Sequence, residues 1–163
     1  MHSRLLRAWL RWRRLPASER SATLAVAGLV PFVTISLRLI GFPRTLRWIE
    51  WSAQGAPLIA ESESVVLGEA TRALARVRRR TPWTGRCLAQ ALGLWWILRR
   101  RGLTASLSLG VRRTGDALQA HAWVVSAGQV IGDSAIVAQT YHAHFTSATG
   151  RLAFRATRRP NLI

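Results

Sequence analysis

Cysteine is nearly absent from this chain, whose 163 residues include a single one, Cys87. One cysteine excludes an internal disulfide framework and a zinc site built from several thiolates. It is typical of a reducing compartment or of indifference to redox conditions. The lone thiol is therefore either a small apolar side chain, which is the commoner case, or a reactive group.

Acidic residues are also scarce, with 7 against 24 basic residues, and every basic residue is an arginine. The formal net charge of +17 indicates an acidic partner: nucleic acid, an anionic membrane surface or an acidic peptide. The arginines are spread along the chain, however, so solvated surface explains many of them equally well. No recognisable nucleic-acid-binding motif accompanies them.

Charge is absent from the strongly apolar stretch "ATLAVAGLVPFVTISL" at residues 22–37. It is shorter than the roughly 20 apolar residues of a transmembrane helix, and it contains Pro31 and is followed by Arg38. The basic region before it is too long for a signal peptide. We therefore predict a buried helix here. Residues 1–15 predict an amphipathic, arginine-rich helix that leaves peripheral membrane contact open.

The periodicity changes along the chain. Residues 1–60 predict a basic and apolar helical region, and residues 61–163 a catalytic core that begins with a helix over 65–80, capped by Ser62 or Ser64. A second core helix is predicted over 87–101, with Gly102 as its stop. Strands are then predicted at 104–112, 118–125 and 129–137, the last two joined by "SAG". The fold class is α+β, a helix packed on an antiparallel sheet.

Cys87 lies at the predicted start of a helix, where the macrodipole stabilises a thiolate and an unpaired N–H can stabilise an oxyanion. A nucleophilic cysteine also needs a base and a group that orients the base. If "SAG" is a three-residue hairpin loop, Val125 pairs with Gln129, and His121 then lies opposite Asp133. A slip of one residue would undo this pairing, and Asp116 is the other aspartate available.

Three segments together resemble a known family: "CLAQALGLWWILRRRGLTASLSLGVRR", "AHAWVV" and "GQVIGD". They are similar to the transglutaminase-like leader peptidases of lasso-peptide biosynthesis, the protease half of the split B proteins. The resemblance covers residues 82–133. It implies a transglutaminase-like or papain-like core in which Cys87 is the nucleophile, His121 the general base and Asp133 the residue that orients it.

The resemblance also implies the partners and the setting. The substrate would be a ribosomal precursor peptide, cut at its leader–core junction in the cytoplasm, with membrane association left open. A separate leader-recognition protein and an ATP-dependent macrolactam cyclase would act alongside, and no cofactor, metal or nucleic acid would be needed. The same three residues could instead serve acyl transfer to an amine.

Other interpretations remain at this stage. The main alternative is a non-catalytic basic module that binds nucleic acid or membrane, suggested by the charge and by tryptophans among arginines near the N-terminus. His142 and His144 share a strand face, which is weak evidence for a metal site. Gln90, one turn after Cys87, could face the thiol or simply be a surface residue.

Overall fold

The computed structural model describes residues 9–10, 12–54, 62–80, 87–148 and 151–154. Within them the chain forms first helices and then a sheet, so the predicted α+β class is confirmed. Most of the helix predicted over residues 1–15 lies outside the described residues. In chain order the elements are α2 (Ala17–Leu39), α3 (Gly41–Ala53), α4 (Glu63–Arg80), α5 (Cys87–Arg100), β1 (Ala105–Thr114), β2 (Ala117–Ser126), β3 (Gln129–Ile131), α6 (Val137–Thr140), β4 (His142–Ala148) and β5 (Arg151–Phe154).

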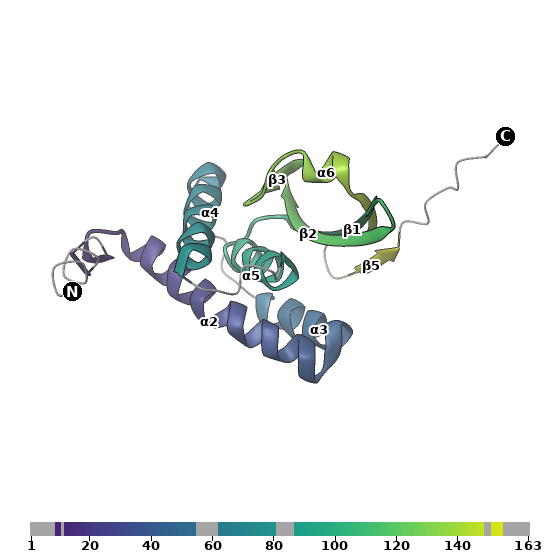
Figure 1. Cartoon of the computed structure of the whole chain (residues 1–163). Helices are drawn as coiled ribbons and strands as arrows, with labels where there is room; N and C mark the ends of the chain where they lie inside the picture. Colours follow the sequence, from purple (N-terminus) through teal and green to yellow (C-terminus); the bar gives the residue numbers. More distant parts are fainter. Residues whose placement is uncertain (1–8, 11, 55–61, 81–86, 149–150, 155–163) are drawn as a thin grey trace.

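Helix α5 is the centre of the molecule. Figure 1 shows it between the helices α2 and α3 on one side and the sheet on the other, with α4 beside it. Trp95, on α5, is completely buried, and its indole N–H donates a 2.9 Å hydrogen bond to the carbonyl of Ala105, the first residue of β1. Because apolar side chains from α2 to β4 form one continuous core, the helix that begins at Cys87 is held on all sides.

Sequence signals at helix ends agree with the observed boundaries. The carbonyl of Ser62, just before α4, accepts hydrogen bonds from the N–H groups of Val65 and Val66. After α5, Gly102 has φ +75, and the N–H of Leu103 bonds to the carbonyl of Leu98, the arrangement of a Schellman C-cap. The predicted stop at Gly102 is therefore correct.

Helix α2 is buried on one face only, so the prediction of a buried helix was half right. Val26 and Val33 are fully buried in the core, whereas Leu24, Ile35 and Leu39 are 52–77% exposed. The uncharged stretch hid this difference because apolar residues occupy both faces of the helix, which removes the contrast that marks an amphipathic helix.

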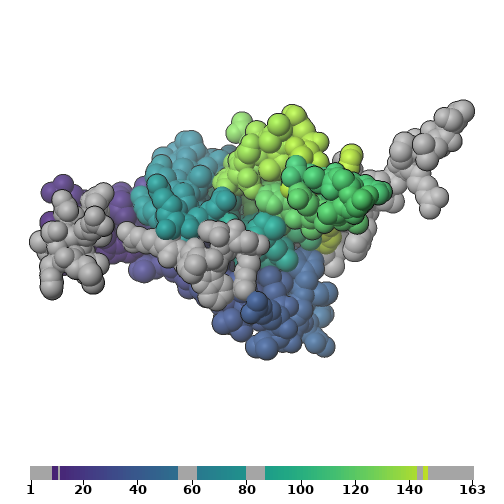
Figure 2. Space-filling view, viewed as in Figure 1, coloured from purple at the N-terminus to yellow at the C-terminus, as the bar shows by residue number. Residues whose placement is uncertain are grey.

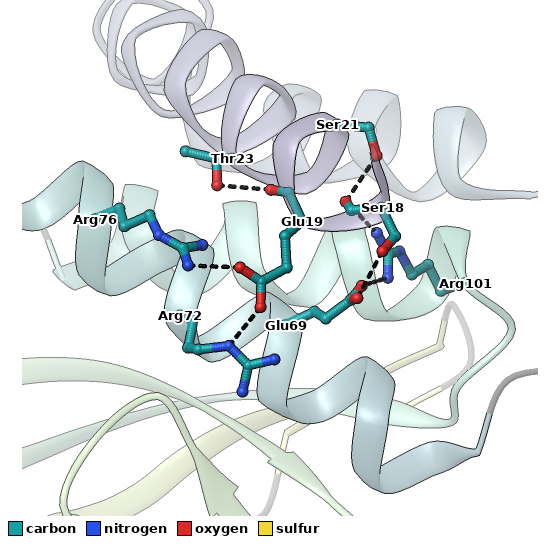
Figure 3. A network of polar contacts seen from close by, with 8 residues as sticks. All are labelled: Ser18, Glu19, Ser21, Thr23, Glu69, Arg72, Arg76 and Arg101. Atoms are coloured by element: carbon teal, nitrogen blue, oxygen red, sulfur yellow. Dashed lines mark hydrogen bonds and ion pairs between the residues drawn. The ribbon is translucent and has the colours of Figure 1, made fainter. Parts of the chain in front are cut away.

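Buried ion pairs attach α2 to the rest of the fold (Figure 3). Glu19 of α2 is 6% exposed and accepts hydrogen bonds from Arg72 and Arg76 of α4. Glu69 of α4 bonds to Ser18 and to Arg101, and Arg101 also donates to the carbonyl of Ser18. Three segments far apart in the sequence are thus joined by charged groups. The predicted domain boundary at residue 60 stays a prediction, since helices on both sides of it share one core.

The sheet has the strand order β3-β2-β1-β4-β5, and every neighbouring pair is antiparallel. Two-residue turns join β1 to β2 and β2 to β3: Gly115-Asp116, with φ +59 at the glycine, and Ala127-Gly128, with φ +47 and +77. The strand predicted over residues 129–137 was too long. It ends at Ile131, and Val137 begins the short helix α6.

Candidate active site

A cavity of about 270 Å³ lies where the N-terminal end of α5 meets the edge of the sheet. Cys87, Gln90 and Leu94 reach it from α5, and the chain from Ala120 to Val124 reaches it from β2. The chain from Ile131 to Asp133 closes another side, and Leu74 and Arg78 of α4 complete the lining. All three residues predicted from the sequence therefore line one cavity.

Cys87 is the first residue of α5, as predicted, and its thiol is free and half-buried. A first-turn N–H has no partner within its own helix, and the partial positive charge at this end favours a negative charge beside it. The local geometry therefore suits a thiolate and an oxyanion at the same place. Leu94 and Ala91, both buried, fix this end of the helix against the core.

His121 and Asp133 form a close pair. His121 Nε2 lies 2.8 Å from Asp133 Oδ2, with the two side chains 22% and 29% exposed. Because Nε2 is engaged by the carboxylate, Nδ1 is the ring nitrogen available to a thiol. The N–H of Ser134 donates to the other carboxylate oxygen, Asp133 Oδ1, at 2.8 Å. The carboxylate is thus oriented by its own backbone and in turn orients the imidazole.

The loop that predicted this pair is not the one observed. The Ala127-Gly128 turn pairs Ser126 with Gln129, so the predicted pairing of Val125 with Gln129 was wrong by one residue. Both central residues of the turn have positive φ, the type I′ conformation. The sequence favoured a three-residue loop because Ala127 is not a usual residue for a left-handed position.

Gly132 explains why His121 and Asp133 nevertheless meet. The β2–β3 ladder ends at Ile131, and Gly132 has φ +74, a conformation that turns the chain out of the strand. A Cβ on Gly132 would also lie 2.8 Å from Leu94 Cδ2, so a side chain here would require the buried Leu94 side chain to move. Asp133 is placed by this turn and not by strand register.

Aromatic rings surround His121. The ring of Tyr141 lies 5.1 Å from it, centroid to centroid, and Trp123 lies 6.4 Å away and stacked. The guanidinium carbon of Arg112 lies 4.9 Å from the centroid of the Tyr141 ring. Trp123 itself fits against Gly110 of β1, where a Cβ would come within 2.8 Å of the indole. The imidazole is therefore packed beside two aromatic rings as well as hydrogen-bonded to Asp133.

The structure adds residues that the sequence did not single out. Tyr141 follows α6 and carries no local motif, so nothing in the sequence assigned it to this site. Arg78 lines the cavity and donates a long hydrogen bond of 3.4 Å to the carbonyl of Gly132. Gln90, for which the sequence left both interpretations open, also lines the cavity, as its spacing of three from Cys87 allows.

The other candidates lie elsewhere. Asp116 is fully exposed in the β1–β2 turn, 3.8 Å from Arg113, so it does not orient His121. His142 is exposed on β4. Among the residues that the structure describes, no three metal-binding side chains gather in one place.

Comparison with known proteins then gives the family. The model of the transglutaminase-like superfamily matches residues 29–148, well over half of the chain. This chain belongs to the transglutaminase-like superfamily. The match begins within α2 and extends through β4, so it includes Cys87, His121 and Asp133. No curated protein and no solved structure shows significant similarity to the chain.

Proposed function

We propose that this protein is a cysteine peptidase with Cys87 as nucleophile, His121 as general base and acid, and Asp133 as the residue that orients His121. One observation carries the proposal. Cys87, a free cysteine at a helix start, shares a cavity with His121, whose Nε2 is hydrogen-bonded to the Asp133 carboxylate. This arrangement supports an activated nucleophile, and so does membership of the superfamily.

The reaction follows from the positions of these groups. Nδ1 of His121 takes the thiol proton, and Cys87 Sγ attacks the scissile carbonyl carbon to form a tetrahedral oxyanion. The Cys87 N–H would stabilise that oxyanion, with the Gln90 side chain, which lines the same cavity, as a second donor. Collapse breaks the C–N bond, and the imidazolium protonates the leaving amine. His121 then deprotonates a water molecule that cleaves the thioester, which restores the thiol.

We further propose that the substrate is a lasso-peptide precursor, cut at its leader–core junction in the cytoplasm. The support is the combined resemblance of residues 82–133 to the leader peptidases of that biosynthesis. A separate leader-recognition protein would present the precursor, and an ATP-dependent cyclase would close the macrolactam ring on the released core. Each step assigned to this chain uses only its own side chains and water, so no cofactor or metal is assigned to it.

The test is a mass-spectrometric cleavage assay on the precursor peptide encoded beside this gene, with the neighbouring leader-recognition protein present. We expect one cut, lost in Cys87→Ala and in His121→Ala. Asp133→Ala should retain weak activity, reduced on the order of 100-fold, because it leaves the nucleophile and base in place but frees the ring.

Each variant must keep the circular dichroism and melting temperature of the wild type. A Cys87→Ala protein that still cuts would remove the thiol from the mechanism. Adding a primary amine to the assay separates the two acyl-transfer outcomes, because a transamidase yields the amide adduct and a peptidase the free carboxylate.

A second proposal concerns the membrane. Helix α2 is the one described helix long and apolar enough to cross a bilayer, but 44% of its apolar window is buried against the rest of the protein. We propose peripheral contact instead of a span, through the exposed face of α2 and α3. On this face the ring of Phe32 from α2 contacts the ring of Trp48 from α3, with their centroids 4.7 Å apart. Its apolar members are Leu24, Phe32, Ile35, Leu39, Trp48 and Trp51.

Arginines accompany that apolar face. Arg38 lies at the end of α2, and Arg44 and Arg47 lie on α3, all three exposed. Tryptophan and aliphatic side chains beside exposed arginines suit the interface of an anionic bilayer, where rings enter the headgroup region and cations meet phosphates. This contact would accompany catalysis, because the cavity with Cys87 lies on the other side of α5.

A further inference from the structure

One edge of the sheet is left uncovered beside the candidate active site. β3 pairs with β2 only from Val124 to Ser126, whereas β2 begins at Ala117. Within the described part of the chain, no strand lies along the outer side of β2 over residues 117–123. Ala120 and His121 line the catalytic cavity, so this open edge leads directly into it.

The two hairpin turns determine which backbone groups face the open side. Residues that flank a two-residue turn form a hydrogen-bonded pair, and such pairs alternate along the ladder. Thr114 pairs with Ala117, so the odd-numbered residues of β2 bond to β1. Ser126 pairs with Gln129, so the even-numbered residues bond to the β3 side. Both turns give the same alternation.

Leu118 and Ala120 therefore direct their N–H and C=O groups away from β1, beyond the end of β3. Residues 113–120 are all exposed, and the Leu118 side chain is 75% exposed. In Figure 2 the green surface of this hairpin lies at the side of the molecule opposite the purple part of α2. An exposed row of unpaired backbone groups is a template for another strand.

We propose that the leader–core segment of the substrate binds as an added strand along residues 117–121 of β2. Its backbone would hydrogen-bond to Leu118 and Ala120 and bring the scissile carbonyl to Cys87. This binding mode rests on the proposed peptidase function for its chemistry, but not for the binding itself. The occupant is a peptide because the edge offers backbone donors and acceptors in alternation and continues into the cavity.

Leu118→Pro tests the edge, with Leu118→Ala as its matched control. Proline removes the outward N–H and leaves the bonds to β1 untouched, whereas alanine removes the same side chain but keeps the N–H. We expect KM to rise roughly three- to tenfold for Leu118→Pro with kcat near that of wild type, and less than about twofold for Leu118→Ala. Equal kinetics of the two variants would overturn the proposal.

N-methylation of the substrate backbone tests the same contact without changing the protein. In a synthetic 16-residue peptide spanning the leader–core junction, methyl groups on alternate amides should weaken cleavage, and methyl groups on the amides between them should not. A loss that ignores this alternation contradicts strand addition. Because the methylated peptides are tested on the wild-type protein, this experiment remains informative even if Leu118→Pro does not fold.

Amide hydrogen exchange by NMR measures binding apart from chemistry. In full-length Cys87→Ala protein with the same peptide at millimolar concentration, we expect the amides of Leu118 and Ala120 to become protected. Those of Gln119 and His121, already bonded to β1, should change little. If these amides become protected but the wild-type protein does not cleave the peptide, the proposed binding mode stands and the proposed peptidase activity is contradicted.

Two results would contradict the binding mode itself. One is cleavage by wild type with no protection of the Leu118 and Ala120 amides, or no binding of the peptide at all. The other is protection of these amides without peptide as protein concentration rises, which would assign the edge to a second copy of the chain.

Discussion

Gly132 has the most specific role of any single residue outside the proposed triad. Its positive φ and its contact with α5 place Asp133 beside His121. Gly132→Ala should lower the free energy of unfolding by about 2–4 kcal/mol, because it combines left-handed strain with a clash at Leu94 Cδ2. Cleavage should fall with it, as Asp133 moves.

Gly128→Ala is the matched control for this substitution. Gly128 has φ +77, close to that of Gly132, but nothing lies within 4 Å of the position of its Cβ. We expect only the strain cost of about 1–2 kcal/mol and unchanged cleavage. Urea denaturation with a parallel activity assay measures both variants. Equal losses for the two would show that the contact with α5 does not matter.

At the residue scale, the sequence identified Cys87, His121 and Asp133 but not the reason they meet. The prediction that His121 opposes Asp133 assumed a three-residue loop, whereas the observed turn has two residues. If the observed β2–β3 ladder continued past Ile131, Asp133 would oppose Ala122 and not His121. The two-residue turn at Ala127 is determined by how the flanking strands pair with each other. The turn propensities of the individual residues do not include that pairing. Tyr141 reaches the His121 ring, and Arg78 reaches the cavity, only through tertiary packing.

At the element scale, the attachment of α2 depends on pH through Glu19. Burial alone would raise the pKa of Glu19, but the hydrogen bonds and positive charges of Arg76 and Arg72 outweigh it and lower the pKa. A carboxyl with a lowered pKa in the folded state adds stability above its unfolded pKa, near 4.5. That stability is lost as the pH falls through the lowered folded value.

Glu19→Gln should therefore cost about 2 kcal/mol at pH 7, and the difference from wild type should shrink as the pH falls from about 5 towards 3. The cost lies below that of a fully buried pair because Arg72 is 54% exposed. Glu63→Gln is the control, since Glu63 is exposed in the first turn of α4. A constant difference at all pH values would assign the effect to packing instead of charge.

Helices and strands were more predictable than their environment. The spacing of apolar residues gave α4 and α5, and alternation gave β1 and most of β2, because each of these patterns is local. The length of β3 and the half-exposed state of α2 depend on what packs against them, and the sequence contains no local record of that. Ser108 is a further example. Its place in the polar–apolar alternation predicts a solvent-facing side chain, but both faces of β1 are buried at this point, and Ser108 is buried.

At the scale of the whole molecule, the charge and the apolar face predict binding to anionic vesicles. The double variant Trp48→Ser/Trp51→Ser should partition onto vesicles containing about 30% anionic lipid at least tenfold less than wild type, because two ring insertions are lost. Added salt should weaken binding of both proteins. Vesicle flotation measures the partition, and peptide cleavage in solution should be unchanged.

Ile136→Ser is the control for lost surface hydrophobicity, since Ile136 is 61% exposed but lies near α6, away from α2 and α3. An equal loss of binding in this variant would show that no particular face contacts the vesicle. Binding that persists in the tryptophan double variant would leave this face for a protein partner.

The ion pairs of α2 have a consequence for synthesis on the ribosome. Ser18 contacts Glu69 and Arg101, which lie 51 and 83 residues further along the chain. At about 5–20 residues per second, the last residue of α2, Leu39, is made roughly 3–12 s before Arg101. During that interval an uncharged apolar stretch near the start of the nascent chain has no core to enter. Factors that deliver hydrophobic nascent segments to membranes then compete with the protein's own folding for the same helix.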